Sequence, residues 1–353
     1  MSILPVQCFW RFCVVGQVLL AIMCGFNLSP LLTSAYAGTP TAAPSSSLGW
    51  YDDFDSGNDK LKVVTTVAPI SSIVRNIGGT AIDLFGIVPD GVNSHTFEPV
   101  PSDAVALAQA DLIIVNGLGL EEPTIALAEA NLKVGAEIFS LAEDTIAEEE
   151  WVFDFSFPDD GGDPNPHLWV NIPYAMRYAE LTAAILAERD PANATLYEEN
   201  LARYLAQLER LNTAISVAVA TIPVENRKLL TYHDSFAYFA KTYGFTVIGA
   251  VQPSDFSEPA PRDVARLIEQ IREEDVPAVF GSEVFPSQVL ERIAAEAGAA
   301  YIDGLRDDAP PGDPYEPGHS YIGMMLANME LLIPALGGTT EALATIEPFD
   351  TYA

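Results

Sequence analysis

The stretch NATLYEENLARYLAQLERLNTAISVAVAT, from Asn193 to Thr221, decides the fold, because it contains no proline or glycine and repeats apolar residues at steps of three and four. These apolar positions are Leu196, Tyr197, Leu201, Tyr204, Leu205, Leu208, Leu211, Ile215 and Val219. Such spacing predicts one amphipathic helix. At about 1.5 Å per residue, the helix would span roughly 40 Å, enough to run along two lobes rather than complete one. As the only firm connection between lobes it would be a stiff spine, because bending it breaks backbone hydrogen bonds.

Strand and helix patterns alternate on both sides of this helix. The expected strands are Leu61–Val67, Ile82–Val88, Leu112–Asn116 and Ala136–Leu141 before it, and Lys228–Tyr232, Thr246–Val251, Ala278–Ser282 and Ala300–Gly304 after it. The expected helices are one from Pro69 to Gly78, one from Pro101 to Ala110, and then Ser235–Tyr243, Arg262–Glu274, Ser287–Ala297 and Ser320–Leu332. Alternation of this kind is typical of parallel sheets covered by helices. We therefore predict an α/β fold of two lobes, each a mainly parallel sheet flanked by helices, joined by one long rigid α-helix.

Composition divides the rest of the chain into segments. Residues 1–37 carry one charge, then an apolar run and the small-residue sequence SAYA, which is typical of an export signal. Residues 38–59 are rich in Pro, Ser, Gly and Asp and predict a disordered tether. The folded part should then comprise an N-terminal lobe over residues 60–190, the spine helix over 191–222, a C-terminal lobe over 223–336 and a C-terminal tail over 337–353.

The predicted export signal indicates a periplasmic protein. All three cysteines, Cys8, Cys13 and Cys24, lie within the signal, so the exported part would offer neither a disulfide nor a thiolate metal ligand. Cys24 is an alternative lipid-attachment site, although the preceding Met23 fits such a site poorly. The apolar run of the signal is shorter than the roughly 18 residues expected of a membrane span.

The charge balance restricts the partners of the chain. It contains 49 Asp and Glu residues against 17 Lys and Arg residues, for a net charge of −32. A surface this acidic repels phosphates, which excludes a general nucleic-acid or anionic-membrane surface. The electrostatic field of an acidic surface also attracts divalent cations. The ordinary effect of such a surface is to keep the protein soluble.

Three of the four histidines lie in short turn-like contexts. These contexts are NSHTFEP around His95, NPHLW around His167 and TYHDSF around His233. Each places an imidazole beside a strand end or a proline, where the backbone is held and the ring can point into a cleft. We predict that these three are metal ligands. The fourth, His319, directly precedes the last expected helix and is predicted to be a structural or rim residue.

The order of HTFEP, PHLW, the long helix, YHDSF and AYIDGLRDD resembles the metal-binding class of periplasmic solute-binding proteins of ABC importers, the zinc- and manganese-uptake group. The resemblance covers the chain from about residue 60 to 336. It implies a metal ion buried between the lobes with two ligands from each, namely His95 and His167 from the first and His233 and an aspartate from the second. Asp307 is matched to that aspartate, and Asp308 is the alternative. The resemblance also implies the membrane permease of an ABC importer as partner.

The chain departs from the family pattern at two places. His233 stands where manganese-type members more often have glutamate, and the acidic stretch from Glu143 to Asp163 lacks the histidines that zinc-type members often carry there. Any collection of metal by that stretch would depend on carboxylates alone. Three imidazoles and one carboxylate suit tetrahedral Zn²⁺, whereas Mn²⁺ prefers more oxygen ligands. Zinc is therefore the expected ion, with manganese as the alternative.

Two other functional classes are less compatible with the sequence. An exported zinc metalloenzyme would also use three histidines, but the chain has no HExxH or GxSxG motif, and a fourth protein ligand would close the coordination sphere. A surface adhesin would be expected to carry adhesive repeats, and none is present. We therefore expect a monomeric metal-binding protein and not an enzyme.

Several residues near the histidines have expected supporting roles. Asp234 is the expected N-cap for the helix that follows it, with Ser235 as the alternative. Glu283 is expected either to orient a metal-bound imidazole or to cap the helix after Pro286. Three aromatic residues are expected to form the walls of the cleft: Phe97, Trp169 and Tyr232.

Overall fold

The computed structural model describes residues 54, 57–252, 257, 259–285, 287–314 and 316–352. The chain divides into two units, Met1–Ser45 and Ser46–Ala353, and the description below concerns the second. The predicted export signal over residues 1–37, with Cys24, and nearly all of the predicted tether lie outside the described residues.

The first lobe is built on a four-stranded sheet whose strands are all parallel. Its strands are β1 (Leu61–Thr65), β2 (Ile82–Gly86), β3 (Leu112–Val115) and β4 (Glu137–Ser140), in the order β2-β1-β3-β4. Its helices are α1 (Ala68–Gly78), α2 (Asp103–Gln109), α3 (Glu122–Asn131) and α4 (Ile172–Arg189). The strand order reverses direction between β1 and β3, and the crevice at the carboxyl ends beside such a reversal is where α/β sheets bind ligands.

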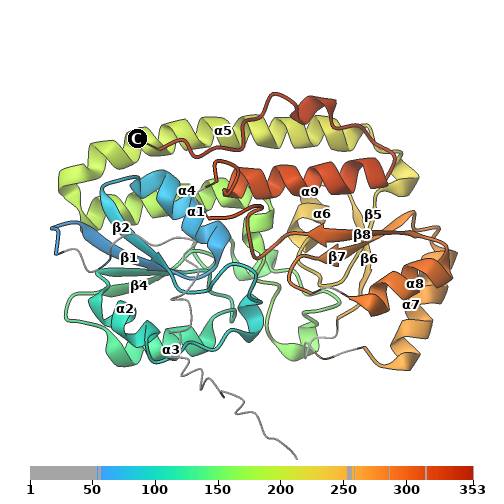
Figure 1. The fold of residues 1–353 in the computed structure, drawn as a ribbon, viewed down its shortest axis with the longest axis horizontal. Coiled ribbons are helices and arrows are strands. Elements are labelled where there is room, and N and C mark those ends of the chain that lie inside the picture. The colour runs from blue at the N-terminus through green and yellow to red at the C-terminus, as the bar shows by residue number, and fades with distance from the viewer. Residues whose placement is uncertain are drawn as a thin grey trace, which may run out of the picture. The chain divides into compact units, whose positions relative to one another are not determined.

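The second lobe repeats the same arrangement (Figure 1). Its strands are β5 (Lys228–Thr231), β6 (Thr246–Ala250), β7 (Ala278–Ser282) and β8 (Ala300–Leu305), all parallel and in the order β6-β5-β7-β8. Its helices are α6 (Ala237–Tyr243), α7 (Pro261–Glu273), α8 (Gln288–Ala297) and α9 (Tyr321–Ala335). The prediction of two parallel α/β lobes is confirmed.

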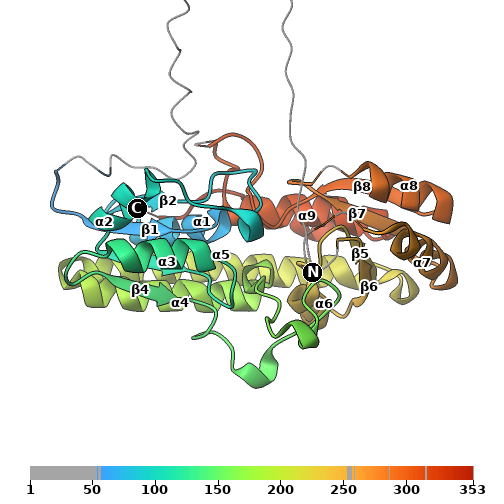
Figure 2. The same ribbon diagram turned by 90° about the horizontal axis from the view of Figure 1, so that it is seen from below.

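The long helix α5 (Ala194–Ala220) joins the lobes and reaches from one to the other in both views (Figures 1 and 2). Its buried face carries the apolar residues that the periodicity singled out, among them Tyr197, Leu208 and Ile215, and packs against α1, α4 and α9. The predicted spine helix is thus confirmed. Its partner α4, for which no helix was predicted, lies alongside it.

The segment after α9 forms a second connection between the lobes. It runs back along α5, where Gln207 donates a hydrogen bond to the carbonyl of Glu347 at 3.1 Å (Figure 1). At its end, Asn76 of α1 donates to the Asp350 carboxylate at 2.8 Å and accepts from the backbone N–H of Thr351 at 2.8 Å. The expectation that α5 is the only firm connection is therefore wrong, because the last residues of the chain tie α9 back to the first lobe.

None of the helices within the described residues is both long enough and apolar enough to cross a membrane.

Candidate metal centre

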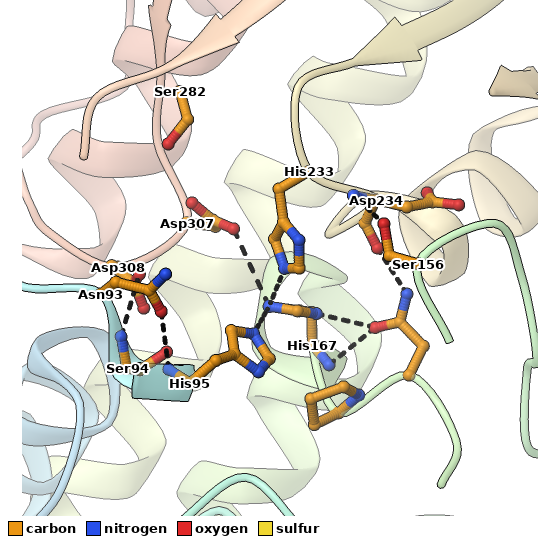
Figure 3. A network of polar contacts seen from close by, with 12 residues as sticks. Asn93, Ser94, His95, Ser156, His167, His233, Asp234, Ser282, Asp307 and Asp308 are labelled. Carbon is orange, nitrogen blue, oxygen red and sulfur yellow. Dashed lines mark hydrogen bonds and ion pairs between the residues drawn. The ribbon is translucent and has the colours of Figure 1, made fainter. Parts of the chain in front are cut away.

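The predicted ligands come from loops that follow the strands, and those of both lobes meet (Figure 3). His95 lies on a short 3₁₀ turn after β2, and His167 directly precedes a similar turn that leads into α4. In the second lobe, His233 is the second residue after β5, and Asp307 is the second residue after β8. The parallel strands therefore deliver side chains that are far apart in sequence to a single place.

The three imidazoles converge through the same ring atom. His95 Nε2 lies 3.0 Å from His167 Nε2, and His233 Nε2 lies 3.1 Å from the same atom. The nearest oxygen of Asp307 lies 3.8 Å from His167 Nε2. A tetrahedral zinc ion with bonds of about 2.0–2.1 Å needs ligand atoms about 3.3 Å apart. Among the described residues, His95, His167 and His233 form a cluster whose geometry suits one metal ion.

Burial keeps these imidazoles neutral. His167 is fully buried and His233 nearly so. Burial, with repulsion from the neighbouring His233, lowers the pKa of both His95 and His167 well below the ordinary value. Burial alone lowers the pKa of His233 to about 3. Since only a neutral imidazole binds a metal, all three are ready to act as ligands at neutral pH.

The hydrogen bonds around His167 select its tautomer. The side-chain oxygen of Asn165 lies 2.8 Å from His167 Nδ1 and also accepts the backbone N–H of His167 at 3.0 Å. The amide nitrogen of Asn165 in turn donates to the carboxylate of Asp154 at 2.5 Å and to the carbonyl of Asp234 at 2.6 Å. This amide orientation makes Nδ1 the protonated nitrogen, so the lone pair of Nε2 points at the centre.

Sequence reasoning missed Asn165 as a functional residue. It stands two positions before His167 in NPHLW, and that spacing is the only local signal. Its partners Asp154 and Asp234 come from different lobes, so its role becomes apparent only in the fold.

A partly buried glutamate, Glu283, shapes the turn that carries the aspartates. One oxygen of Glu283 accepts the backbone N–H groups of Asp307, Asp308 and Ala309 at 3.0, 3.0 and 3.2 Å. Both sequence expectations for Glu283 are wrong, because it binds this turn and because Ser287 is the residue that caps α8. Backbone N–H groups that are shielded from water need acceptors, and here one carboxylate oxygen accepts all three N–H groups of the turn.

The two aspartates of this turn point in different directions. Asp307 faces His167, and its carbonyl accepts the indole N–H of Trp169 at 2.8 Å. Asp308 faces the first lobe, where the backbone N–H of Ser94 approaches it at 3.4 Å. Burial, with the nearby Glu283, raises the pKa of Asp307 well above its ordinary value and that of Asp308 to about 7. The geometry thus favours Asp307 over Asp308 as the oxygen donor to a metal.

Two further expectations concern residues beside the histidines. Asp234 does not cap α6, whose N-cap position is Phe236. Instead its carboxyl group contacts that of Asp154, and this neighbour adds to the burial that raises the pKa of Asp234. His319 lies outside the cluster and pairs with Asp90 of the first lobe at 3.2 Å, as a structural residue would.

The aromatic surroundings agree only in part with the prediction. Trp169 packs against His167 with ring centroids 5.0 Å apart, as expected of a cleft wall. Tyr232 stacks on Phe285 at 5.2 Å, and Phe97 packs against the core of the first lobe. The ring that contacts all three imidazoles is Phe157, which was not predicted.

Comparison with known proteins places this geometry in a family. The family described as zinc-uptake complex component A, periplasmic, matches residues 63–335. The chain is 32% identical over 276 residues to the manganese-binding lipoprotein MntA of Halalkalibacterium halodurans, covering 78% of this chain and 88% of that protein. It is also 32% identical over 286 residues to the manganese ABC transporter substrate-binding lipoprotein PsaA of Streptococcus pneumoniae, covering 80% and 90%.

Solved structures show the same fold. The periplasmic zinc-binding protein TroA of Treponema pallidum superposes with a TM-score of 0.71 at 27% identity, covering 78% of this chain and 99% of that one. The manganese-bound periplasmic metal-binding protein of Candidatus Liberibacter asiaticus superposes with a TM-score of 0.70 at 25% identity, covering 78% and 100%. The match to the family spans most of the chain and every residue of the cluster, so the chain belongs to the family of the periplasmic component A of zinc-uptake complexes.

Proposed function

We propose that this protein binds one divalent transition metal ion between its two lobes, in the periplasm, and delivers it to the membrane permease of an ABC importer. The observation that carries the proposal is the convergence of three neutral imidazoles from both lobes on one point. Relatives that are named as substrate-binding lipoproteins of metal ABC transporters support the transport role.

The proposed ligands are His95, His167, His233 and Asp307. Three nitrogens and one oxygen at tetrahedral spacing favour Zn²⁺. Relatives carry names that refer to manganese and to zinc, so Mn²⁺ is the alternative cargo. Manganese would need additional oxygen ligands, which the second oxygen of Asp307 or water would have to supply.

Binding rather than catalysis follows from the number of protein ligands. A catalytic zinc keeps a position open for water or substrate, whereas four protein donors fill a tetrahedral sphere. We propose that the protein is monomeric, since two ligands from each lobe complete the site within a single chain.

The direct test is metal analysis of the protein purified from its own exported compartment, followed by calorimetry of the metal-free protein. We expect one ion per chain, and a loss of affinity by orders of magnitude in His95→Ala and in His233→Ala. His319→Ala is the matched control, because it removes an imidazole that lies outside the cluster. Unchanged affinity in both cluster variants would overturn the site assignment.

A further inference from the structure

Phe157 has the same relation to each imidazole of the cluster. The centroid of its ring lies 5.4 Å from that of His95, 5.7 Å from that of His167 and 5.6 Å from that of His233. A ring nearly equidistant from three imidazoles lies close to the axis about which they are arranged. Its side chain is only 9% exposed, although it belongs to an acidic loop. An apolar ring in this place keeps water from the centre on its side.

A cavity of about 300 Å³ reaches the same side of the cluster. Its lining includes His95, Ser156 and Phe157. Neither His167 nor His233 lines it. Phe157 therefore stands between this space and the two deeper imidazoles, and His95 is the one imidazole at its edge.

The backbone around Phe157 is held by Asp154. The N–H of Asp154 donates to the carbonyl of Phe157 at 2.7 Å, and the Asp154 carboxylate accepts the N–H of Phe157 at 3.1 Å. The other oxygen of this carboxylate accepts from Asn165, which orients His167. One side chain thus connects the covering ring to the orientation of a proposed ligand.

The neighbouring Ser156 ties the same turn to the second lobe. Its hydroxyl accepts the backbone N–H of Asp234 at 3.2 Å and donates to the carbonyl of Gln252 at 3.5 Å. Phe157 belongs to the first lobe, but these hydrogen bonds of Ser156 make the position of the ring over the centre depend on the second lobe. A change in the separation of the lobes would therefore move the ring.

We propose that Phe157 determines metal selectivity and the rate of metal release, by covering the centre on the side of the cavity; this rests on the proposed function. With the ring in place, water cannot approach from that side, and the ion is limited to its protein ligands. Zn²⁺ is satisfied with four ligands, whereas Mn²⁺ prefers more, with a larger share of oxygen. Release toward the cavity requires the ring to move, and the contacts of Ser156 with the second lobe oppose that movement.

The test compares Phe157→Ala and Phe157→Leu with Phe155→Ala. Phe155 lies on the same loop but is 54% exposed, so its variant controls for the loss of an aromatic ring. Affinities for Zn²⁺ and Mn²⁺ are measured by chelator competition, and release rates by stopped flow into excess chelator. In Phe157→Ala we expect about tenfold faster release of Zn²⁺ and a preference for Zn²⁺ over Mn²⁺ that narrows by about tenfold. Phe157→Leu should lie between that variant and the wild type, and Phe155→Ala should match the wild type.

Ser156→Ala is a second variant, which keeps the ring of Phe157 but removes the hydrogen bonds between the neighbouring hydroxyl group and the second lobe. We expect this variant to release Zn²⁺ faster than the wild type with little change in selectivity. Equal release rates and selectivity in Phe157→Ala, Phe155→Ala and the wild type would overturn the inference. Failure of the proposed function is seen separately, because the wild type would then bind neither ion.

Discussion

Replacing Asn165 with alanine should weaken both the fold and metal binding, and the two effects can be separated. The side chain accepts two hydrogen bonds from His167 and donates two more, to Asp154 and to the carbonyl of Asp234. Its loss leaves buried groups without their partners, at about 1–3 kcal/mol for each such group. Allowing for relaxation, we expect the free energy of unfolding of the metal-free protein to fall by about 2–4 kcal/mol.

Metal affinity should fall as well, because His167 loses the contact that fixes its tautomer. Loss of such an orienting contact lowers metal affinity by about 10–100-fold. Urea unfolding of the metal-free protein and chelator competition for Zn²⁺ measure the two quantities. Asn200→Ala is the control, because Asn200 is equally buried but donates to the carbonyl of Ile77 in the first lobe. If both variants lower stability and neither lowers affinity, Asn165 has only a structural role and the reasoning about His167 is refuted.

Three further predictions follow from the centre and from the connections between the lobes. Burial lowers the pKa of His233 to about 3 in the folded protein, whereas the pKa of an unfolded histidine is about 6.5. Between these two values only the unfolded chain gains a proton on His233, so the free energy of unfolding falls as the pH falls. Between pH 7.5 and 5, the free energy of unfolding measured in urea should thus fall more steeply in the metal-free wild type than in His233→Gln, which keeps all the buried carboxyl groups. An identical dependence on pH in the two proteins would contradict this. Because the pKa of Asp307 is raised well above its ordinary value, the share of metal-free protein that must lose a proton from Asp307 to bind Zn²⁺ grows as the pH falls, and calorimetry in buffers of different ionisation enthalpy should detect more proton release in the wild type than in Asp307→Asn. Small-angle scattering of metal-free and metal-loaded protein should differ little in radius of gyration, and a contraction of several ångströms would refute a stiff connection between the lobes.

The sequence predicted the elements well where apolar pattern and turn residues agree. The strand Ala278–Ser282 has the bounds that were expected. The first strand was expected to reach Val67 but ends at Thr65, because Val67 is already the N-cap of α1, where its apolar side chain is still fully buried. The helix α3 has little separation between an apolar and a polar face, so periodicity gives no signal for it.

The site was predictable to the extent that single residues carry unusual chemistry. His95, His167 and His233 stand in turn contexts where an imidazole has little structural use, and these three form the cluster found among the described residues. Asn165 and Phe157 were not predictable in this way, because asparagine and phenylalanine are ordinary in loops. Their roles come from contacts with residues of the other lobe, and such contacts leave no trace in local sequence.

The connections between the lobes bear on how a permease would distinguish the loaded protein from the empty one. Helix α5 and the C-terminal segment that runs back along it both connect the lobes, and a continuous apolar core includes residues of both sheets. Wide hinge opening would have to break this core as well as the backbone hydrogen bonds of α5, whereas domain closure elsewhere uses a few loop residues as hinges. The loops at the centre have no such constraint, since the turns that carry His95 and Asp307 and the segment that carries Phe157 are held by a few hydrogen bonds. Metal binding should therefore change the order of these three loops more than the separation of the lobes, and their outer surface is where we expect the permease to detect the ion.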